Sequence, residues 1–247
     1  PAPALPLFLV VPLRRISIPT MCSSTPFVFI AISSLVLTLM LSILLPTLPS
    51  DHTLSFKRLP MLIRRPALMI IYLLVTLVVT AHYSAYRYLE PFMQQLAQQG
   101  ANFTTLLLLL FGAAGIFGSV LFSTLGKRFP SSLLSGAIAA ITLCMGLFLV
   151  TSTHAPAIMT VCIVWGIAMM LINLSMQVRV LSLAPDATDV SMSLMSGIYN
   201  IGIGAGALIG NQVISHLGMN LVGYVGFAFV LMSRSEGRRG GKDGRSR

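Results

Sequence analysis

The chain has 247 residues, of which 55% are hydrophobic and 9% are charged, and its mean hydropathy is +0.88. Soluble domains carry about 25% charged residues, so this composition excludes a soluble globular domain and indicates an integral membrane protein. The net charge of +10 does not indicate a nucleic-acid partner, because the basic residues gather in the last fifteen residues and at the ends of apolar runs.

Six or seven apolar runs approach the roughly 20 residues that a membrane-spanning helix needs. The alternating strands of a membrane barrel are absent from the sequence. We therefore expect an all-α membrane protein, with an irregular Pro-rich start over residues 1–24, a spanning helix over 25–48 and a basic cytoplasmic loop over 49–66. A helix bundle should follow over 67–232, and a basic tail, disordered or non-native, over 233–247. Within the bundle, the expected helices cover 66–90, 103–125, 131–150, 157–183, 190–216 and a short 219–232.

The basic residues between these helices predict the orientation. Seven of them fall on one side of the predicted membrane: Lys57, Arg58, Arg64, Arg65, Lys127, Arg128 and Arg179. Arg87 is alone on the other side. Because cytoplasmic loops carry the excess of Lys and Arg, the side with seven is predicted to be cytoplasmic.

Enzyme chemistry finds no support in the sequence. The three cysteines are far apart in the sequence and form no Cys-x-x-Cys pair. We therefore expect buried thiols at Cys22, Cys144 and Cys162. The chain contains no nucleotide-binding loop, nucleophile elbow or metal-ligand pattern. We expect no cofactor, no metal and no catalytic residue.

A polar aromatic stripe ends the helix predicted over 66–90. At 100° per residue, His82, Tyr83, Tyr86, Arg87 and Glu90 fall within one arc of about 140°. Polar groups in a membrane helix normally face a water-filled cavity or another helix, so the stripe is a candidate lining of a solute pathway. The alternative for Tyr86 is an interfacial aromatic belt. His82 is as well explained by a hydrogen bond to a neighbouring helix as by proton transfer.

Small residues dominate the helix predicted over 190–216. Gly202, Gly206 and Gly210 recur every four residues, a spacing that lets another helix approach closely. Ser196, Asn200 and Gly204 form a second row, and we assign Gly197 and Gly204 to helix packing as well. Asn200 could equally face the pathway or bond to a neighbouring helix, because a mid-membrane amide needs a partner.

A face of the helix predicted over 157–183 ends in two amides. Trp165, Met169, Asn173 and Gln177 are spaced four residues apart and share this face. Hydrogen bonding between helices is the slightly favoured explanation for Asn173 and Gln177, and solute binding is the other. Arg179 is expected to extend to the inner interface.

Several segments together resemble the bacterial sugar efflux transporters of the major facilitator superfamily, most closely the arabinose and thiogalactoside exporters. The resemblance covers about residues 46–226. It lies in Arg65-Pro-Ala-Leu-Met, residues 80–86, Glu90-Pro-Phe, residues 165–170, Met176-Gln-Val, residues 183–190 and residues 197–212. It implies the C-terminal six-helix half of the family fold, with family helices seven to eleven and a truncated twelve, preceded by helix six. Gly126, Lys127 and Arg128 would belong to the cytoplasmic loop motif, in which Ser123 replaces the usual Asp.

The same resemblance implies proton-coupled efflux of sugars or related small polar solutes across the bacterial inner membrane. The implied partners are a sugar, protons, the lipid bilayer and a missing N-terminal half of the transporter. The expected solute pathway consists of His82, Tyr83, Tyr86, Asn173, Gln177 and Asn200, because tyrosine and amide groups bind hydroxyl-rich solutes. The alternatives are a drug or amino-acid exporter of the same superfamily and a non-transporting membrane fragment.

Overall fold

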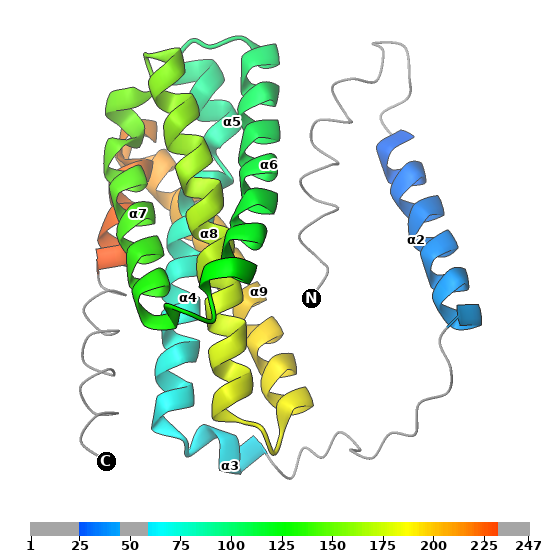
Figure 1. Ribbon diagram of the computed structural model, residues 1–247. Helices are drawn as coiled ribbons and strands as arrows, with labels where there is room; N and C mark the ends of the chain where they lie inside the picture. The colour runs from blue at the N-terminus through cyan, green and yellow to red at the C-terminus, as the bar shows by residue number, and fades with distance from the viewer. Residues whose placement is uncertain (1–24, 45–58, 232–247) are drawn as a thin grey trace.

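The computed structural model describes residues 25–44 and 59–231, and the part of the chain that it describes is helical, without strands (Figure 1). This confirms the all-α fold class. The helices are α2 (Thr25–Leu44), α3 (Leu59–Ile63), α4 (Pro66–Tyr86), α5 (Leu89–Pro91), the π-helical turn η2 (Phe92–Leu96), α6 (Ala101–Leu125), α7 (Pro130–Thr151), α8 (Ala155–Leu183), α9 (Thr188–Leu217) and the 3-10 turn η3 (Met219–Leu221). The predictions for 1–24, for most of 49–66 and for the basic tail fall outside the described residues.

Six of the described helices are long and apolar enough to cross a membrane, and a shorter apolar helix, Met219–Leu231, follows them. The protein is therefore a multi-pass membrane protein. Helices α4 to α9 form a bundle, whereas the side chains described along α2 are almost all exposed and α2 stands apart from the bundle in Figure 1. Consecutive helices of the bundle alternate in direction (Figure 1). One end of the bundle therefore carries the basic residues Arg64, Arg65, Lys127, Arg128 and Arg179. Lys57 and Arg58 fall outside the described residues.

The sequence predicts that an outer loop over 91–102 follows the helix over 66–90, and this expectation is wrong for the first half of the loop. Helix α4 breaks at Tyr86, but the chain returns to helix in α5 and η2 and leaves it only after Leu96. The reason is Pro91, whose ring clashes with the carbonyl four residues earlier, at Arg87. A break at that carbonyl removes the clash, so the proline distorts the helix without ending it.

Helices α4 and α9 run parallel and contact each other through small residues. A Cβ added at Gly206 would lie 2.6 Å from the carbonyl oxygen of Thr80, and one at Gly210 would lie 2.6 Å from that of Ser84. A Cβ added at Gly202 would meet Val79 at 2.9 Å. Only glycine allows the two backbones to approach this closely. We call this contact the glycine seam.

Side chains of α4 and of the break that follows it donate hydrogen bonds to backbone carbonyls along the same seam. The hydroxyls of Tyr72 and Tyr88 donate to the carbonyls of Ser191 and Ala207, each at 2.8 Å. The hydroxyl of Thr80 donates to the carbonyl of Gly202 at 3.4 Å. These polar groups are thus satisfied inside the bundle, and the seam is held by both packing and hydrogen bonds.

An ion pair joins the start of α4 to the link between α8 and α9. The two terminal nitrogens of Arg65 each donate to a carboxylate oxygen of Asp186 at 2.8 Å. Nη1 of Arg65 also donates to the carbonyl of Leu183 at 2.8 Å. Leu183 is the last residue of α8, where carbonyls lack a partner within the helix, so Arg65 also caps α8.

Candidate functional site

The centre of the bundle contains a cluster of rings from three helices. We define the aromatic cluster as His82, Tyr83 and Tyr86 of α4, Phe111 of α6 and Trp165 of α8. The imidazole of His82 is 3% exposed and stacks on Tyr86 at 5.0 Å and on Phe111 at 5.9 Å between centroids. Tyr83 and Trp165 meet it edge-on at 4.8 and 5.6 Å. The cluster therefore holds the C-terminal half of α4 against α6 and α8.

His82 is fixed by one directional hydrogen bond within this cluster. The indole Nε1–H of Trp165 donates to His82 Nδ1 at 3.1 Å. An indole nitrogen can only donate, so Nδ1 must be the unprotonated acceptor and the imidazole must carry its hydrogen on Nε2. A proton arriving at Nδ1 would break this bond. Proton uptake there and this hydrogen bond between α4 and α8 are therefore mutually exclusive.

Two tyrosines of the predicted pathway lie at the edge of the cluster. Tyr83 and Tyr86 are both half-buried. Tyr83 also lies within electrostatic range of Tyr199, a half-buried residue of α9. Three phenol rings, from α4 and α9, thus border the same region of the bundle. Tyrosine hydroxyls both donate and accept hydrogen bonds, so this edge can bind a polar solute.

The two amides of α8 bond to each other. The side-chain nitrogen of Gln177 donates to the side-chain oxygen of Asn173 at 3.1 Å, and both residues are half-buried. Asn173 lies two helical turns after Trp165 along α8, so the amide pair is nearer the end of the bundle that carries the basic residues than the aromatic cluster is. The structure does not bring Asn173 and Gln177 into contact with His82.

Asn200 lies apart from the other predicted pathway residues. It is two positions, or about 200°, before Gly202, which faces α4, so it lies on the opposite side of α9. Its side chain is exposed and donates to the carbonyl of Ser196 at 2.8 Å. Gly197 and Gly204 share this exposed side, where an added Cβ would meet nothing within 4 Å. No described residue packs on these two glycines, and their assignment to helix packing stays a prediction.

The predicted loop motif forms the tight link between α6 and α7. Gly126 follows the last residue of α6, and Lys127 and Arg128 are exposed. The guanidinium of Arg128 lies 5.3 Å from the ring centroid of Phe129. Ser123, which stands in place of the usual Asp, donates its hydroxyl to the carbonyl of Val120 at 2.7 Å. This serine is thus bonded within its own helix.

Sequence reasoning missed two members of this region, Phe111 and Tyr199. Phe111 follows a run of five leucines, where nothing local distinguishes a ring that faces the bundle from one that faces lipid. Tyr199 precedes Asn200, and the four-residue glycine spacing could have placed it: it is three positions before Gly202 and therefore close to the side that contacts α4. Cys144 and Cys162 are buried free thiols, and Cys22 falls outside the described residues.

Comparison with protein families agrees with this architecture. The sequence model of the Major Facilitator Superfamily matches residues 23–210, which is more than half of the chain. The match includes α2, α4, α6, α7 and α8 and reaches Gly210 of the glycine seam. The multi-pass helical bundle and this match lead to one conclusion: the chain belongs to the Major Facilitator Superfamily, a family of membrane transporters.

Proposed function

We propose that the protein takes part in proton-coupled efflux of sugars or related small polar solutes across a bacterial inner membrane. The observation that carries the proposal is the pair of half-buried rings of Tyr83 and Tyr86, whose centroids are 6.2 Å apart inside a membrane-spanning helix. Tyr199 of α9 lies within electrostatic range of Tyr83. Phenol rings stack on the apolar faces of sugars, while their hydroxyls exchange hydrogen bonds with sugar hydroxyls. Asn173 and Gln177 add an amide pair on α8, closer to the inner end.

His82 supports this proposal as the link between protons and helix movement. Its bond from Trp165 requires a neutral imidazole, so protonation would release α8 from α4 at the aromatic cluster. Tyr83 and Tyr86 contact the His82 ring and would shift with it. In this proposal His82 acts behind the solute-binding tyrosines rather than in the pathway itself.

The exposed side of α9 is a candidate contact surface for further membrane helices. It is polar for a spanning helix, since Ser196, Gly197, Asn200 and Gly204 are all exposed. An exposed amide is costly in hydrocarbon. We propose that this side faces the N-terminal half of a transporter of the family type, with the solute between the two halves.

Transport by the protein in liposomes tests the proposal. Vesicles loaded with radiolabelled arabinose would be diluted into buffers with and without a pH difference, and tracer loss would be followed. Tyr83→Phe removes one hydroxyl and keeps the ring, so we expect slower flux with unchanged thermal stability. Tyr224→Phe is the matched control, because Tyr224 is exposed on the last apolar helix. His82→Phe should abolish the response to the pH difference.

The same assay distinguishes the alternatives. Equal arabinose flux in Tyr83→Phe and unmodified protein would contradict the assignment of the tyrosine edge. Flux of a drug or an amino acid without flux of sugar would favour the other exporter class of the superfamily. A folded protein that moves no solute with or without a pH difference would instead favour a membrane protein that only associates with other helices.

A further inference from the structure

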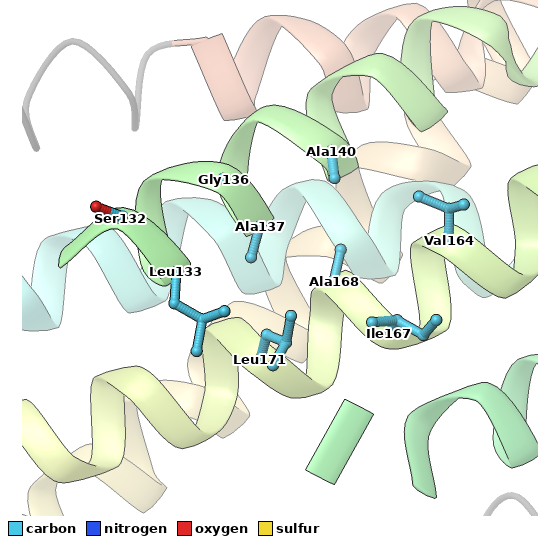
Figure 2. Close-up of a pocket in the computed structure, with 9 residues that line it drawn as sticks. All are labelled: Ser132, Leu133, Gly136, Ala137, Ala140, Val164, Ile167, Ala168 and Leu171. Carbon is cyan, nitrogen blue, oxygen red and sulfur yellow. The ribbon is translucent and has the colours of Figure 1, made fainter. Parts of the chain in front are cut away.

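A groove on the outside of the bundle separates α7 from α8, away from the aromatic cluster. Its volume is about 260 Å³, and Figure 2 shows side chains of both helices along it. The lining includes Leu133, Gly136 and Ala140 of α7 and Ala168 and Leu171 of α8. Gly136 and the alanines provide the hollow, because they leave the space that larger side chains would fill. Ser132 is the polar residue of the lining.

Size and lining make this groove unsuitable for a sugar and suitable for a hydrocarbon chain. Its volume is below the roughly 300–1,000 Å³ of small-molecule sites, which also place several polar groups around the ligand. From Ser132 to Ala140 the groove follows eight residues of α7, or about 12 Å at 1.5 Å per residue. Half of a bilayer's hydrocarbon core is about 15 Å thick. The groove therefore extends along most of one leaflet, starting at the cytoplasmic end.

Cationic side chains gather where the groove begins. The guanidinium of Arg179 donates to the hydroxyl of Ser131, in the first turn of α7 and next to Ser132 of the groove lining. Lys127 and Arg128 lie in the link that leads into this turn. The carboxylates of the described residues, Glu90, Asp186 and Asp189, all lie on other elements. The mouth of the groove is thus positive at the depth where lipid phosphates lie.

A buried hydroxyl lies between this mouth and the groove. Ser175 is 5% exposed, and its hydroxyl oxygen is a buried side-chain atom without a hydrogen-bond partner among the described residues. Ala168, Leu171, Ser175 and Arg179 follow each other at three- and four-residue steps, so they form one stripe along α8. The stripe changes from apolar to hydroxyl to cation toward the cytoplasmic end, as a phospholipid does from acyl chain to ester to phosphate.

We propose that this groove is a binding site for one anionic phospholipid of the cytoplasmic leaflet. An acyl chain lies between α7 and α8 against Gly136 and Ala168, and the phosphate lies at Arg179, with Lys127 and Arg128 beside it. Basic pockets between spanning helices on the cytoplasmic side are known to bind acidic head groups. The site is separate from the proposed solute pathway, and its occupancy does not depend on which solute the protein carries.

Native mass spectrometry of the full chain in detergent tests the site. The protein would be titrated with phosphatidylglycerol or with phosphatidylcholine carrying the same acyl chains, and the bound lipid counted. Arg179→Gln should weaken phosphatidylglycerol binding about fivefold and leave phosphatidylcholine unchanged. Arg179→Lys keeps the charge and should restore most of the binding. Arg87→Gln, at the opposite end of the bundle, is the charge control.

A second variant tests the groove itself and does not depend on Arg179. A Cβ added at Gly136 meets nothing within 4 Å, so Gly136→Leu should fold and fill the groove. We expect it to remove the tightly bound phosphatidylglycerol, whereas Ala113→Leu, an equally apolar addition on the exposed side of α6, should not. The proposed site would be overturned if both lipids bound equally well and neither Arg179→Gln nor Gly136→Leu changed that binding. A dimer of the chain that persists in excess phosphatidylglycerol and dissociates in Gly136→Leu would also overturn it, because a second copy would then occupy the groove.

Discussion

Helix α4 contacts its neighbours in two different ways. Toward α9 it meets glycines, so the two backbones almost touch, and the hydroxyls of Tyr72 and Thr80 donate to carbonyls of α9. Toward α6 and α8 it presents large rings, and one hydrogen bond, from Trp165 to His82, joins the helices there. The first contact depends on the absence of side-chain volume, and the second on its presence. Added volume should therefore destabilise the glycine seam most, whereas the aromatic cluster should be sensitive to loss of the hydrogen bond from Trp165 to His82.

The largest expected effect comes from adding volume to the glycine seam. In Gly206→Leu, the new Cβ would start 2.6 Å from the Thr80 carbonyl and 3.0 Å from the Ser84 nitrogen, both backbone atoms that cannot move aside. We expect α4 and α9 to separate. The loss in the free energy of unfolding should be at least the about 1–3 kcal/mol that is typical of overpacking. Thermal unfolding in detergent, read by size-exclusion chromatography, measures it.

Gly204→Leu is the matched control, two residues away on the same helix. An added Cβ at Gly204 meets nothing within 4 Å, so its melting temperature should stay close to that of the unmodified protein. Equal destabilisation by the two substitutions would show that α9 packs on both sides, and the distinction between its closed and open sides would have to be abandoned.

A smaller loss is expected from removing the hydrogen bond at the aromatic cluster. His82→Phe keeps a ring against Tyr86 and Phe111 but leaves the indole N–H of Trp165 buried without an acceptor. An unsatisfied buried donor costs about 1–3 kcal/mol, so the melting temperature should fall. Trp165 is the only tryptophan of the chain, so its fluorescence spectrum reports this contact directly.

His154→Phe provides the control for that experiment, since His154 is exposed in the short link before α8. It should change neither the melting temperature nor the emission of Trp165. If His82→Phe left the Trp165 emission and the melting temperature unchanged, the indole would have another acceptor and the coupling of α4 to α8 through His82 would be wrong.

These two contacts also differ in how far the sequence predicts them. A spanning helix needs only an apolar run of sufficient length, so α6 to α9 could be located within two residues at every end. The four-residue spacing of Gly202, Gly206 and Gly210 likewise indicates a close helix contact from local information alone. The side on which Asn200 lies follows from the same arithmetic.

The aromatic cluster required the tertiary structure. The partner of His82 is 83 positions away, and no pattern within α4 identifies an indole on α8 as that partner. Phe111 belongs to a run of apolar residues whose orientation depends on packing alone. The continuation of helix past Pro91 depends on a local break that the sequence allows but does not require. The groove between α7 and α8 is likewise a consequence of packing, because small residues form a hollow only where no third helix covers them.

The smallest effect is expected where neither volume nor burial dominates, at the ion pair between the start of α4 and the link from α8 to α9. The side chains of Arg65 and Asp186 are 31% and 44% exposed, so solvent screens their attraction. Hydrogen bonding to Asp186 raises the pKa of Arg65 above its ordinary value, so the guanidinium stays charged at any pH at which the protein is handled. Asp186→Asn should lower the melting temperature slightly, and the difference should shrink as salt is added.

Arg65→Gln should lower the melting temperature more than Asp186→Asn does. Part of this effect should remain in high salt, because the substitution also removes the donor to the Leu183 carbonyl at the end of α8. If the two substitutions lowered the melting temperature equally and salt removed both effects, Arg65 would act only as a surface charge, and its role as a cap of α8 would be contradicted.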